Sequence, residues 1–527
     1  MGKAQRAVLT SVALRAALVT GTCALVAACG NGTSQASSSA KARERSIAAP
    51  TATSRPQLAQ ERQGNVSVSA RLLDWPEFGL DPQRTDASAE ATGIVAGNID
   101  HLRHVHVKLP GTVDSSPIYL HDVKVAHQTV DAIVVSTTYG RTLALDAATG
   151  RILWTFTPPG YSNWAGSAQI TTASPLADPS GRYVYAASPN GLVHKLSLAS
   201  GHEDSRGAWP VRVTLDPSHQ KLAAALNIDG AYVITATGGY IGDIPPYQGH
   251  VVLIDRASGH IVSVYNTLCA NRRRLFAPES CPVSDSAILS RAGAVVEPGG
   301  RRILLATGNA PWNGHTDLGD SVLELTLPSL RLRQAYTPPD QEKLNDDDLD
   351  LGSSGPALLG GDRAVLAGKD GILRVLNLSR LDGSAPPREG RYEERLGGAA
   401  QQLPLPGGGM LFTAPAVWRH GGRTTVFIAD EHATAAYALR SGRLALLWQN
   451  QTPGTSPVLA GGLLYVYEPV AGGIEVYDPG SPHALTKLPG TPGHWNSPIV
   501  VDGHVIEPEG DANEHELSGT LDIFSAP

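Results

Sequence analysis

Carboxylates and a lysine in the middle of the chain have types and spacing that could do chemistry. Residues 346–348 are three consecutive aspartates, and Asp350 follows between two leucines. Neighbouring carboxylates that stay charged would raise the pKa of Asp350 and with it the readiness of that group to exchange a proton. The same run is also typical of a solvated loop. Lys369 lies in a Lys-Asp-Gly segment that by itself makes a hairpin turn.

Asn309 and two cysteines are further candidates. Asn309 follows a strand-like apolar run at 303–305, so its amide either hydrogen-bonds a turn or ligates a metal. Cys269 and Cys281 are twelve positions apart, and in an exported protein such an isolated pair predicts a disulfide. In the chain-entropy model a loop of this size stabilises the fold by roughly 3 kcal/mol. A metal pair is the alternative, but no third thiolate or nearby His cluster completes a site.

Several familiar motifs are missing from the sequence. The 17 His residues show no His-x-x-x-His or other paired metal spacing. The glycines at 407–409 lack the Lys-Ser or Lys-Thr of a phosphate-binding loop. The Ser-Ser-Gly segment at 353–355 is not a nucleophile elbow, because no helix is expected after it.

Composition limits the class of protein. Of the 527 residues, 42% are apolar and 17% charged, which excludes a disordered chain. The 56 Gly and 38 Pro argue against a helical bundle, because these are the two poorest helix formers. A turn-rich β protein fits best. The net charge of -7 offers no basic surface for nucleic acid, so we expect no nucleic-acid partner.

The first residues are typical of an export signal. Lys3 and Arg6 precede an apolar stretch at 16–28, which is too short to span a bilayer, and Cys29 follows. The sequence Val-Ala-Ala-Cys that ends at Cys29 resembles a bacterial lipobox, which predicts that the mature chain begins at Cys29 and carries a lipid on it. An ordinary signal peptide with a coincidental cysteine is the alternative.

The predicted organisation has three parts. Residues 1–28 are expected to be the lipoprotein signal peptide, 29–70 a flexible tether rich in Ser, Ala and Thr, and 71–527 the folded body. No other segment is expected to span a bilayer. We therefore expect the protein on the extracytoplasmic face of the cell membrane, anchored to the lipid bilayer by its N-terminal lipid.

A repeated strand-and-turn unit runs through the body. It is clearest at 132–156, where three short strands are joined by tight turns and Leu143 and Leu145 alternate with Ala144 in a period of two. An Asp-x-x-Thr-Gly turn ends the middle strand, with Asp able to bond its own backbone. Similar segments recur at 196–201, 254–259, 375–377, 437–448 and 476–478.

The number of units follows from a second marker, a small residue before proline. It occurs at Ser116-Pro117, Ser174-Pro175, Gly355-Pro356, Ala414-Pro415, Ser456-Pro457 and Ser497-Pro498. The gap between the second and third markers has room for three units, so two more would begin near Asn227 and Val295. Eight units of four strands predict an all-β, eight-bladed β-propeller. A solenoid is the alternative, but its units are usually shorter and contain helices.

The last unit is incomplete, and an unassigned strand at 104–109 precedes the first one. Placing this N-terminal strand at the outer edge of the final blade would close the ring and remove a free strand edge.

Several blocks of the body resemble the pyrroloquinoline quinone (PQQ) quinoprotein dehydrogenase superfamily of eight-bladed propellers. Segment 74–85 is similar to the first segment of the fold in that family, and 144–154 is similar to its tryptophan-docking repeat. Segment 306–313, Ala-Thr-Gly-Asn-Ala-Pro-Trp-Asn, resembles the Gly-Asn-Pro-Ala-Pro-Trp-Asn block of alcohol-oxidising members. The resemblance extends over about 73–527.

The resemblance implies roles for individual residues. In the dehydrogenases PQQ lies beside Ca²⁺ in the central funnel, and a carboxylate takes the proton of the alcohol. By position, Asp350 would be the catalytic carboxylate and Lys369 the cation that contacts the quinone. Asn309 would ligate the metal, with Asp243 as the nearest carboxylate to a second metal-binding position.

Two features of the family are missing. The body has no adjacent Cys-Cys pair, and no Trp lies between Trp209 and Trp312, where the family usually supplies an aromatic floor under PQQ. Trp154 and Trp448 are expected to dock neighbouring blades rather than to stack on a ligand. These observations favour a binding or scaffold protein of the cell envelope that holds a small-molecule ligand or a protein partner. The alternative is a PQQ- and Ca²⁺-dependent oxidoreductase that acts on an alcohol or sugar.

Overall fold

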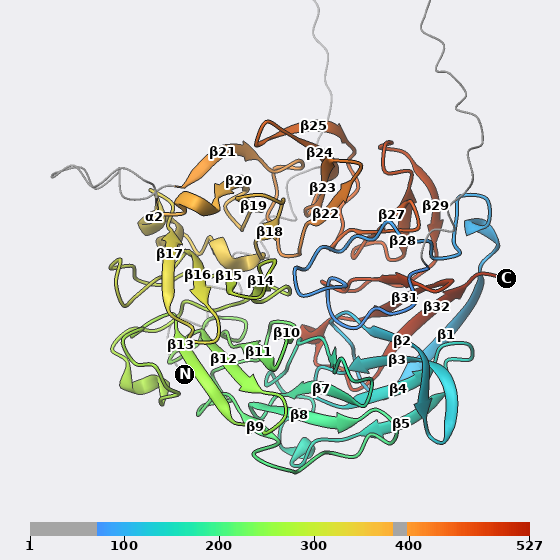
Figure 1. Ribbon diagram of the computed structural model, residues 1–527, viewed down its shortest axis with the longest axis horizontal. Helices are drawn as coiled ribbons and strands as arrows, with labels where there is room; N and C mark the ends of the chain where they lie inside the picture. The colour runs from blue at the N-terminus through green and yellow to red at the C-terminus, as the bar shows by residue number, and fades with distance from the viewer. Residues whose placement is uncertain (1–70, 383–397) are drawn as a thin grey trace, which may run out of the picture. The chain divides into compact units, whose positions relative to one another are not determined.

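Eight four-stranded antiparallel sheets stand around a central axis (Figure 1). This computed structural model describes residues 71–382 and 398–527. The predicted eight-bladed β-propeller is confirmed. Cys29 and the segments 1–28 and 29–70 lie outside the described residues. Within the described part of the chain, no helix has the length and apolar character needed to cross a membrane.

The blades are formed by consecutive strands, apart from the last. Blade 1 contains β2 (Ile118–Val125), β3 (Gln128–Ser136), β4 (Thr142–Asp146) and β5 (Ile152–Phe156); blade 2 contains β6 (Leu176–Ala177), β7 (Tyr183–Ser188), β8 (Leu192–Ser197) and β9 (Val211–Arg212); blade 3 contains β10 (Asn227–Asp229), β11 (Tyr232–Ala236), β12 (His250–Asp255) and β13 (Ile261–Asn266); blade 4 contains β14 (Val295–Val296), β15 (Arg302–Ala306), β16 (Val322–Thr326) and β17 (Leu332–Tyr336).

The second half of the ring has the same form. Blade 5 contains β18 (Ala357–Leu358), β19 (Arg363–Leu366), β20 (Ile372–Asn377) and β21 (Ala399–Pro404); blade 6 contains β22 (Ala416–His420), β23 (Arg423–Ala429), β24 (Thr434–Arg440) and β25 (Arg443–Gln449); blade 7 contains β26 (Val458–Ala460), β27 (Leu463–Tyr467), β28 (Ile474–Tyr477) and β29 (Ala484–Leu488); blade 8 contains β30 (Ile499–Val501), β31 (His504–Glu509), β32 (Gly519–Ser525) and β1 (Arg103–Leu109). The helices are α2 (Gln341–Asp346) and the short 3-10 turns η1 (Ile99–His101), η2 (Tyr161–Asn163), η3 (Pro278–Ser280), η4 (Leu351–Ser353), η5 (Leu378–Arg380) and η7 (Ala512–Glu514).

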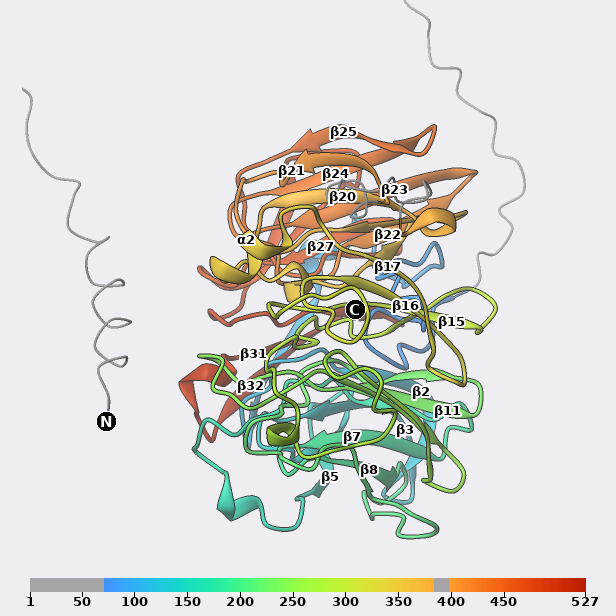
Figure 2. The same cartoon turned by 90° about the vertical axis from the view of Figure 1, so that its left-hand side faces the viewer.

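Each blade packs on two neighbours, so both faces of its strands are buried. In β4, Leu143 and Leu145 pack toward blade 8, whereas Ala144 packs toward blade 2. The period of two in the sequence therefore separates two blade-to-blade contacts. In the side view of Figure 2, blades 5 and 6 and blades 1 and 2 lie at opposite ends of the molecule.

The predicted blade boundaries and docking tryptophans are confirmed. The two units without a proline marker begin at β10 and β14, with Asn227 and Val295 as their first residues. The indole N–H of Trp154 donates to the Leu198 carbonyl of blade 2 at 2.8 Å. The indole N–H of Trp448 donates to the Pro479 carbonyl of blade 7, also at 2.8 Å. Each indole fixes its blade to the next one.

The ring closes as predicted. Strand β1 pairs antiparallel with β32 along its full length, from Arg103 opposite Ser525 to Leu109 opposite Gly519. Blade 8 is thus built from both ends of the described chain, and β1 forms its outer strand.

The predicted disulfide is present. Cys269 and Cys281 are bonded in the long connection between β13 and β14, which removes the metal-pair alternative. The bridge is buried in a small apolar cluster with Leu268, Phe276 and Ala310. It therefore serves as the centre of this connection, where no strand supplies a core.

The segment before β1 crosses the inner strands of the ring. Its carbonyls accept hydrogen bonds from Ala177 of blade 2, Val296 of blade 4, Val417 of blade 6, Leu459 of blade 7 and Asp502 of blade 8. The sequence resemblance had identified this segment only as the beginning of the fold. The structure shows that it joins blades on all sides of the axis.

Arg84 anchors this segment. Its guanidinium is buried, lies 2.7 Å from a carboxylate oxygen of Glu77 and donates to the carbonyls of Leu226 and Ala292 in the connections that lead to blades 3 and 4. Burial raises the pKa of Glu77 to about 7, against the opposing charge of Arg84. The guanidinium thus satisfies polar groups from three distant parts of the chain.

Replacing Arg84 is expected to destabilise the whole ring. Arg84→Ala leaves Glu77 and several buried carbonyls without a donor, so the free energy of unfolding should fall by about 3–5 kcal/mol. Urea denaturation followed by tryptophan fluorescence measures this change. Arg206→Ala is the control, because this side chain is 74% exposed and its ion pair is at the surface. Equal stability of the two variants would contradict an anchoring role for Arg84.

Candidate functional site

The path of the strands brings one class of loops to one face of the propeller. In a four-stranded meander, the loops between second and third strands lie on the same face as the connections between blades. Asp243, Asn309 and Lys369 lie in such loops of blades 3, 4 and 5. Asp350 lies in the connection from blade 4 to blade 5. The fold therefore brings all four predicted residues to one face.

A cavity of ≈ 250 Å³ lies on the axis at this face. Its lining comes from loops of seven blades, which is why it surrounds the axis. Three of the four predicted residues line it: Asp243, Asp350 and Lys369. Asn309 is not part of the lining, but its backbone N–H donates to Asp350. The other polar and aromatic groups of the wall are Asp114, Thr172, Lys221, Tyr240, Arg291, Asp348, Ser353, Phe412, His494, Trp495 and Asn513.

Asp350 is the centre of a compact polar cluster. One of its carboxylate oxygens lies 2.5 Å from the Lys369 ammonium, and the other accepts the backbone N–H of Asn309 at 2.8 Å. A side chain at Gly308 would collide with this carboxylate, so the glycine makes room for it. The side-chain amide of Asn309 donates to Asp348 at 2.7 Å, whereas its buried Oδ1 has no hydrogen-bond partner among the described residues.

Charges in this cluster act on one another. Burial acts to lower the pKa of Lys369, but the carboxylates of Asp350 and Asp348 outweigh it and raise the pKa. Partial burial raises the pKa of Asp243; a hydrogen bond from Tyr247 opposes this, and the charge of Asp350 adds to it. Lys369 therefore stays protonated, and the raised pKa of Asp243 lets this carboxyl take up a proton more readily than a free aspartate does.

A second ion pair crosses the axis on the other side of the cavity. The Arg291 guanidinium lies 2.7 Å from one carboxylate oxygen of Asp114, and a ring nitrogen of His494 lies 2.7 Å from the other. Arg291 also donates to the carbonyl of Thr172. Burial acts to raise the pKa of Asp114, but the charges of Arg291 and His494 outweigh it and hold the pKa well below its usual range. Asp114 is therefore ionised and neutralises Arg291.

Lys221 is the third cation of the wall. Its ammonium forms no ion pair with any described residue. Burial, with the nearby charge of Arg291, lowers the pKa of Lys221 to about 8. A lysine with this pKa gains from any anion that enters the cavity.

Aromatic rings form one side of the cavity mouth. Phe412 stacks on Trp495 with ring centroids 4.6 Å apart, and His494 stacks on the same indole at 3.9 Å. The Arg291 guanidinium lies 5.5 Å from that indole. The region 210–311, where the resembled family usually supplies an aromatic floor, contributes Tyr240, Leu289 and Arg291 to the wall instead of a tryptophan.

Sequence reasoning missed most of this wall, although the repeat contains the signal. The residue four positions before the first strand of a blade points to the axis: these residues are Asp114, Thr172, Ala223, Arg291, Ser353, Phe412, Gly454 and Trp495. All except Gly454 line the cavity. In six blades this position is two residues before the small residue of the small-Pro marker. Aligning the units on that marker would have found Asp114, Phe412 and Trp495.

A buried Ser-His-Glu relay in blade 2 has the order of groups of a hydrolase triad, but it is not accessible to solvent. The Ser188 hydroxyl lies 2.6 Å from His194 Nε2, and His194 Nδ1 contacts Glu203. Ser188 and His194 are both 0% exposed. No substrate reaches them, so the relay stabilises the blade.

Comparison with known proteins agrees with this architecture. Residues 108–277, less than half of the chain, match the PQQ_2 family model, which is described as outer membrane protein assembly factor BamB. Among curated proteins no sequence matches. Residues 108–277 therefore resemble that family, and the described chain as a whole has the β-propeller fold.

Solved structures with the same fold include PQQ dehydrogenases. A quinohemoprotein alcohol dehydrogenase from Comamonas testosteroni is 16% identical, with a TM-score of 0.61 over 87% of this chain and 81% of that one. One from Pseudomonas putida HK5 is 13% identical, with a TM-score of 0.62 over 86% and 80%. A europium-containing methanol dehydrogenase is 14% identical, with a TM-score of 0.62 over 86% and 98%. At these identities the likeness concerns the fold.

Proposed function

We propose that this chain is a ligand-binding propeller of the cell envelope whose axial cavity holds a small, flat anion. One observation carries the proposal: Lys221 faces the cavity with no ion-pair partner among the described residues, and the stacked rings of Phe412 and Trp495 line the same cavity. An unpaired ammonium in a partly desolvated wall attracts an anion more strongly than it would in water. An aromatic face packs against a flat molecule.

The volume limits the size of the ligand. A cavity of ≈ 250 Å³ is just below the roughly 300–1,000 Å³ that is usual for drug-sized ligands. Arg291 is neutralised by Asp114, and Lys369 by Asp350, so Lys221 supplies the free positive charge. A single compact, flat molecule with at least one carboxylate to pair with Lys221 fits this arrangement.

PQQ, a flat tricarboxylate, is the probe for this proposal. We expect it to quench tryptophan fluorescence at micromolar concentration. Because the pKa of Lys221 is about 8, the ammonium loses its proton as the pH rises through that value. If the protonated form alone binds, affinity should fall about tenfold between pH 7 and pH 9. Isothermal titration calorimetry at the two pH values checks this.

Lys221→Gln should bind PQQ more weakly at pH 7 and lose most of the pH dependence. Lys343→Gln is the matched control, because that lysine is exposed and pairs only with Asp347. Absence of PQQ binding below about 100 μM, or an unchanged profile in Lys221→Gln, would contradict the proposal.

A PQQ- and Ca²⁺-dependent oxidoreductase is the second candidate. The oxygen atoms fit a hard cation: Asn309 Oδ1 is buried and unpartnered, and the carboxylates of Asp350 and Asp243 face the same cavity. Asn309 and Asp243 would hold Ca²⁺, and Lys369 would contact the quinone oxygens. When bound, the pair would supply hydride acceptance from an alcohol or sugar. Asp350, held by Lys369 and the backbone of Asn309, would take the hydroxyl proton.

This second candidate predicts turnover that depends on Asp350. Protein loaded with PQQ and CaCl₂ should reduce an electron-accepting dye in the presence of an alcohol or sugar. Asp350→Asn keeps the shape of the side chain but removes the base, so the rate should fall by about 10²–10⁴-fold. Asp346→Asn, in the exposed part of the acidic run, should keep full activity. Tight PQQ binding without turnover would support the ligand-binding function and contradict the oxidoreductase function.

The envelope location rests on Cys29. We propose that its thiol carries the lipid that holds the protein at the extracytoplasmic face of the membrane. Cys29→Ala should move the protein from the membrane fraction to the soluble fraction, as measured by sedimentation and immunoblot. Cys23→Ala is the control, because it changes a cysteine of the same apolar stretch and leaves the lipobox intact. A Cys29→Ala protein that still sediments with membranes would refute the anchor.

A further inference from the structure

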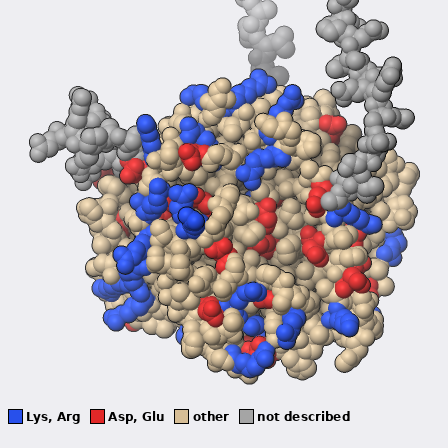
Figure 3. All heavy atoms as spheres, in the orientation of Figure 1, with Lys and Arg blue, Asp and Glu red and all other residues tan. Residues whose placement is uncertain are grey.

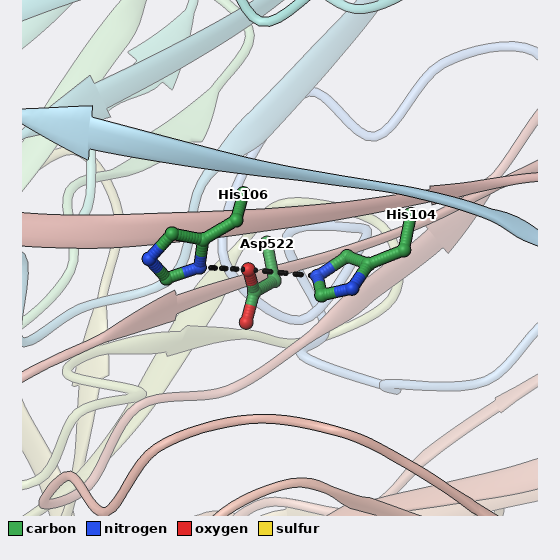
Figure 4. Close-up of side chains that lie close together, drawn as sticks. All are labelled: His104, His106 and Asp522. Atoms are coloured by element: carbon green, nitrogen blue, oxygen red, sulfur yellow. Dashed lines mark hydrogen bonds and ion pairs between the residues drawn. The ribbon is translucent and has the colours of Figure 1, made fainter.

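Two histidines and an aspartate converge at the joint that closes the ring. His104 and His106 lie on the outer strand β1, and Asp522 lies opposite them on β32. Figure 4 shows both imidazoles directed at the same carboxylate oxygen. His104 Nε2 is 2.9 Å and His106 Nδ1 is 2.6 Å from Asp522 Oδ1, and the three donor atoms lie within 4.8 Å of one another.

In this cluster of His104, His106 and Asp522, the strands hold the aspartate in the interior and leave the two histidines partly exposed to solvent. Residues two apart on a strand share a face, so the His-x-His spacing places both rings on one side of β1. His106 is directly opposite Asp522 in the register, and His104 is opposite Phe524, on which its ring stacks at 4.3 Å. The His104 and His106 side chains are 35% and 43% exposed, whereas that of Asp522 is 2% exposed.

Acidic groups behind this cluster lack a matching cation. Glu507 is opposite Asp522 on β31, is 1% exposed, and neither of its carboxyl oxygens has a hydrogen-bond partner in the described chain. Glu509, also buried, lies two residues further along the same face. Among described residues, no Lys or Arg pairs with any of these three acids. Burying a carboxyl without a partner is costly, and burial raises the pKa of Glu507 well above its usual range, so this carboxyl stays protonated.

We infer that His104, His106 and Asp522 form a binding site for a divalent transition-metal ion such as Zn²⁺. Two imidazole nitrogens and one carboxylate oxygen are the ligands that such ions prefer. Metal–ligand bonds of about 2.0–2.2 Å place neighbouring donors about 3 Å apart, and the two imidazole nitrogens already lie 2.9 and 2.6 Å from the Asp522 oxygen. The solvent side of the cluster leaves further coordination positions for water or an exogenous ligand.

A metal at this site would stabilise the closed ring. Its ligands come from the first and the last strand of the propeller, and the pair Asp522 and His106 is 416 positions apart in sequence. A metal that binds only the closed ring adds its binding free energy to the stability of that ring. Hydrogen bonds from the two imidazoles to Asp522 are the alternative reading of the same contacts, and they need no metal.

Calorimetric titration of the full-length protein with ZnCl₂ separates these readings. The protein carries no polyhistidine tag and is first freed of metal with EDTA. We expect a site of micromolar affinity or tighter, together with a rise in Tm on adding Zn²⁺. His104→Asn and His106→Asn should each weaken that site at least about tenfold. Co²⁺ in place of Zn²⁺ should give a visible absorption spectrum of nitrogen and oxygen ligation that both variants lose.

Two controls locate the site. His101→Asn changes an exposed histidine just before β1 and should leave Zn²⁺ binding unchanged. His121→Asn disrupts the separate cluster of His121, Asp131 and Asp502 and should also leave it unchanged. The inference is wrong if Zn²⁺ gives neither heat nor a Tm rise at about 100 μM, or if His106→Asn binds like the unaltered protein.

Discussion

The structure depends on closing a ring from a linear chain. Seven blades are built from consecutive strands, but blade 8 must combine β30, β31 and β32 with β1, which was made before all of them. If β1 left, β32 would become a free edge, and Leu521 and Ile523 would lose the cover of Val105 and Val107, which pack against their cluster. The pairing of β1 with β32 thus differs from every other strand pair of the propeller, because it joins the first strand to the last one.

A second constraint acts at the axis. The inner strands of a propeller converge there. Their backbone groups need hydrogen-bond partners, and the space between them has to be filled. Segment 71–91 supplies these partners on one side: its carbonyls accept hydrogen bonds from blades around the ring, and Arg84 anchors it. On the other side the space is left partly open, and this is the cavity. One end of the axis is therefore structural and the other is available for function. On the face shown in Figure 3, Lys and Arg are interspersed with Asp and Glu.

Most of the fold was predictable because it is periodic. Apolar alternation and turns like the one at 146–150 recur along the body, and the small-Pro marker opens six of the eight units. The number of units, the starts at Asn227 and Val295, and the docking roles of Trp154 and Trp448 therefore follow from local patterns. The path of segment 71–91 was not predictable in this way. The partners of Arg84 lie more than 140 residues away at Leu226 and Ala292, and no local pattern specifies them.

The candidate site was predictable in part for the same reason. Lys369, Asn309 and Asp243 occupy equivalent loops, and Asp350 lies in a connection between blades on the same face, so the repeat brings them together once the fold is known. Arg291 and Lys221 escaped notice because their blades lack the proline marker that would align them. The cluster at the joint escaped for a different reason. A search for helical metal spacing overlooks His-x-His on a strand, and its third ligand, Asp522, lies at the far end of the chain.

The residues four positions before the first strand of each blade surround the axis, and their side chains decide what the cavity can bind. The fold places eight residues around the axis, and a flat ligand needs an apolar surface on each of its faces to be held tightly. Here Phe412 and Trp495 supply one such surface, whereas Arg291 extends across the axis to the carbonyl and carboxylate of Asp114. A guanidinium whose hydrogen bonds are satisfied in its own plane still presents a flat face that stacks on π-systems. The Arg291 guanidinium lies 5.5 Å from the Trp495 indole, which is less than the roughly 7 Å that a flat ligand needs between two surfaces, so these two groups cover each other. Arg291 therefore narrows the cavity beside Trp495, and this one position limits the space that the cavity offers on its aromatic side.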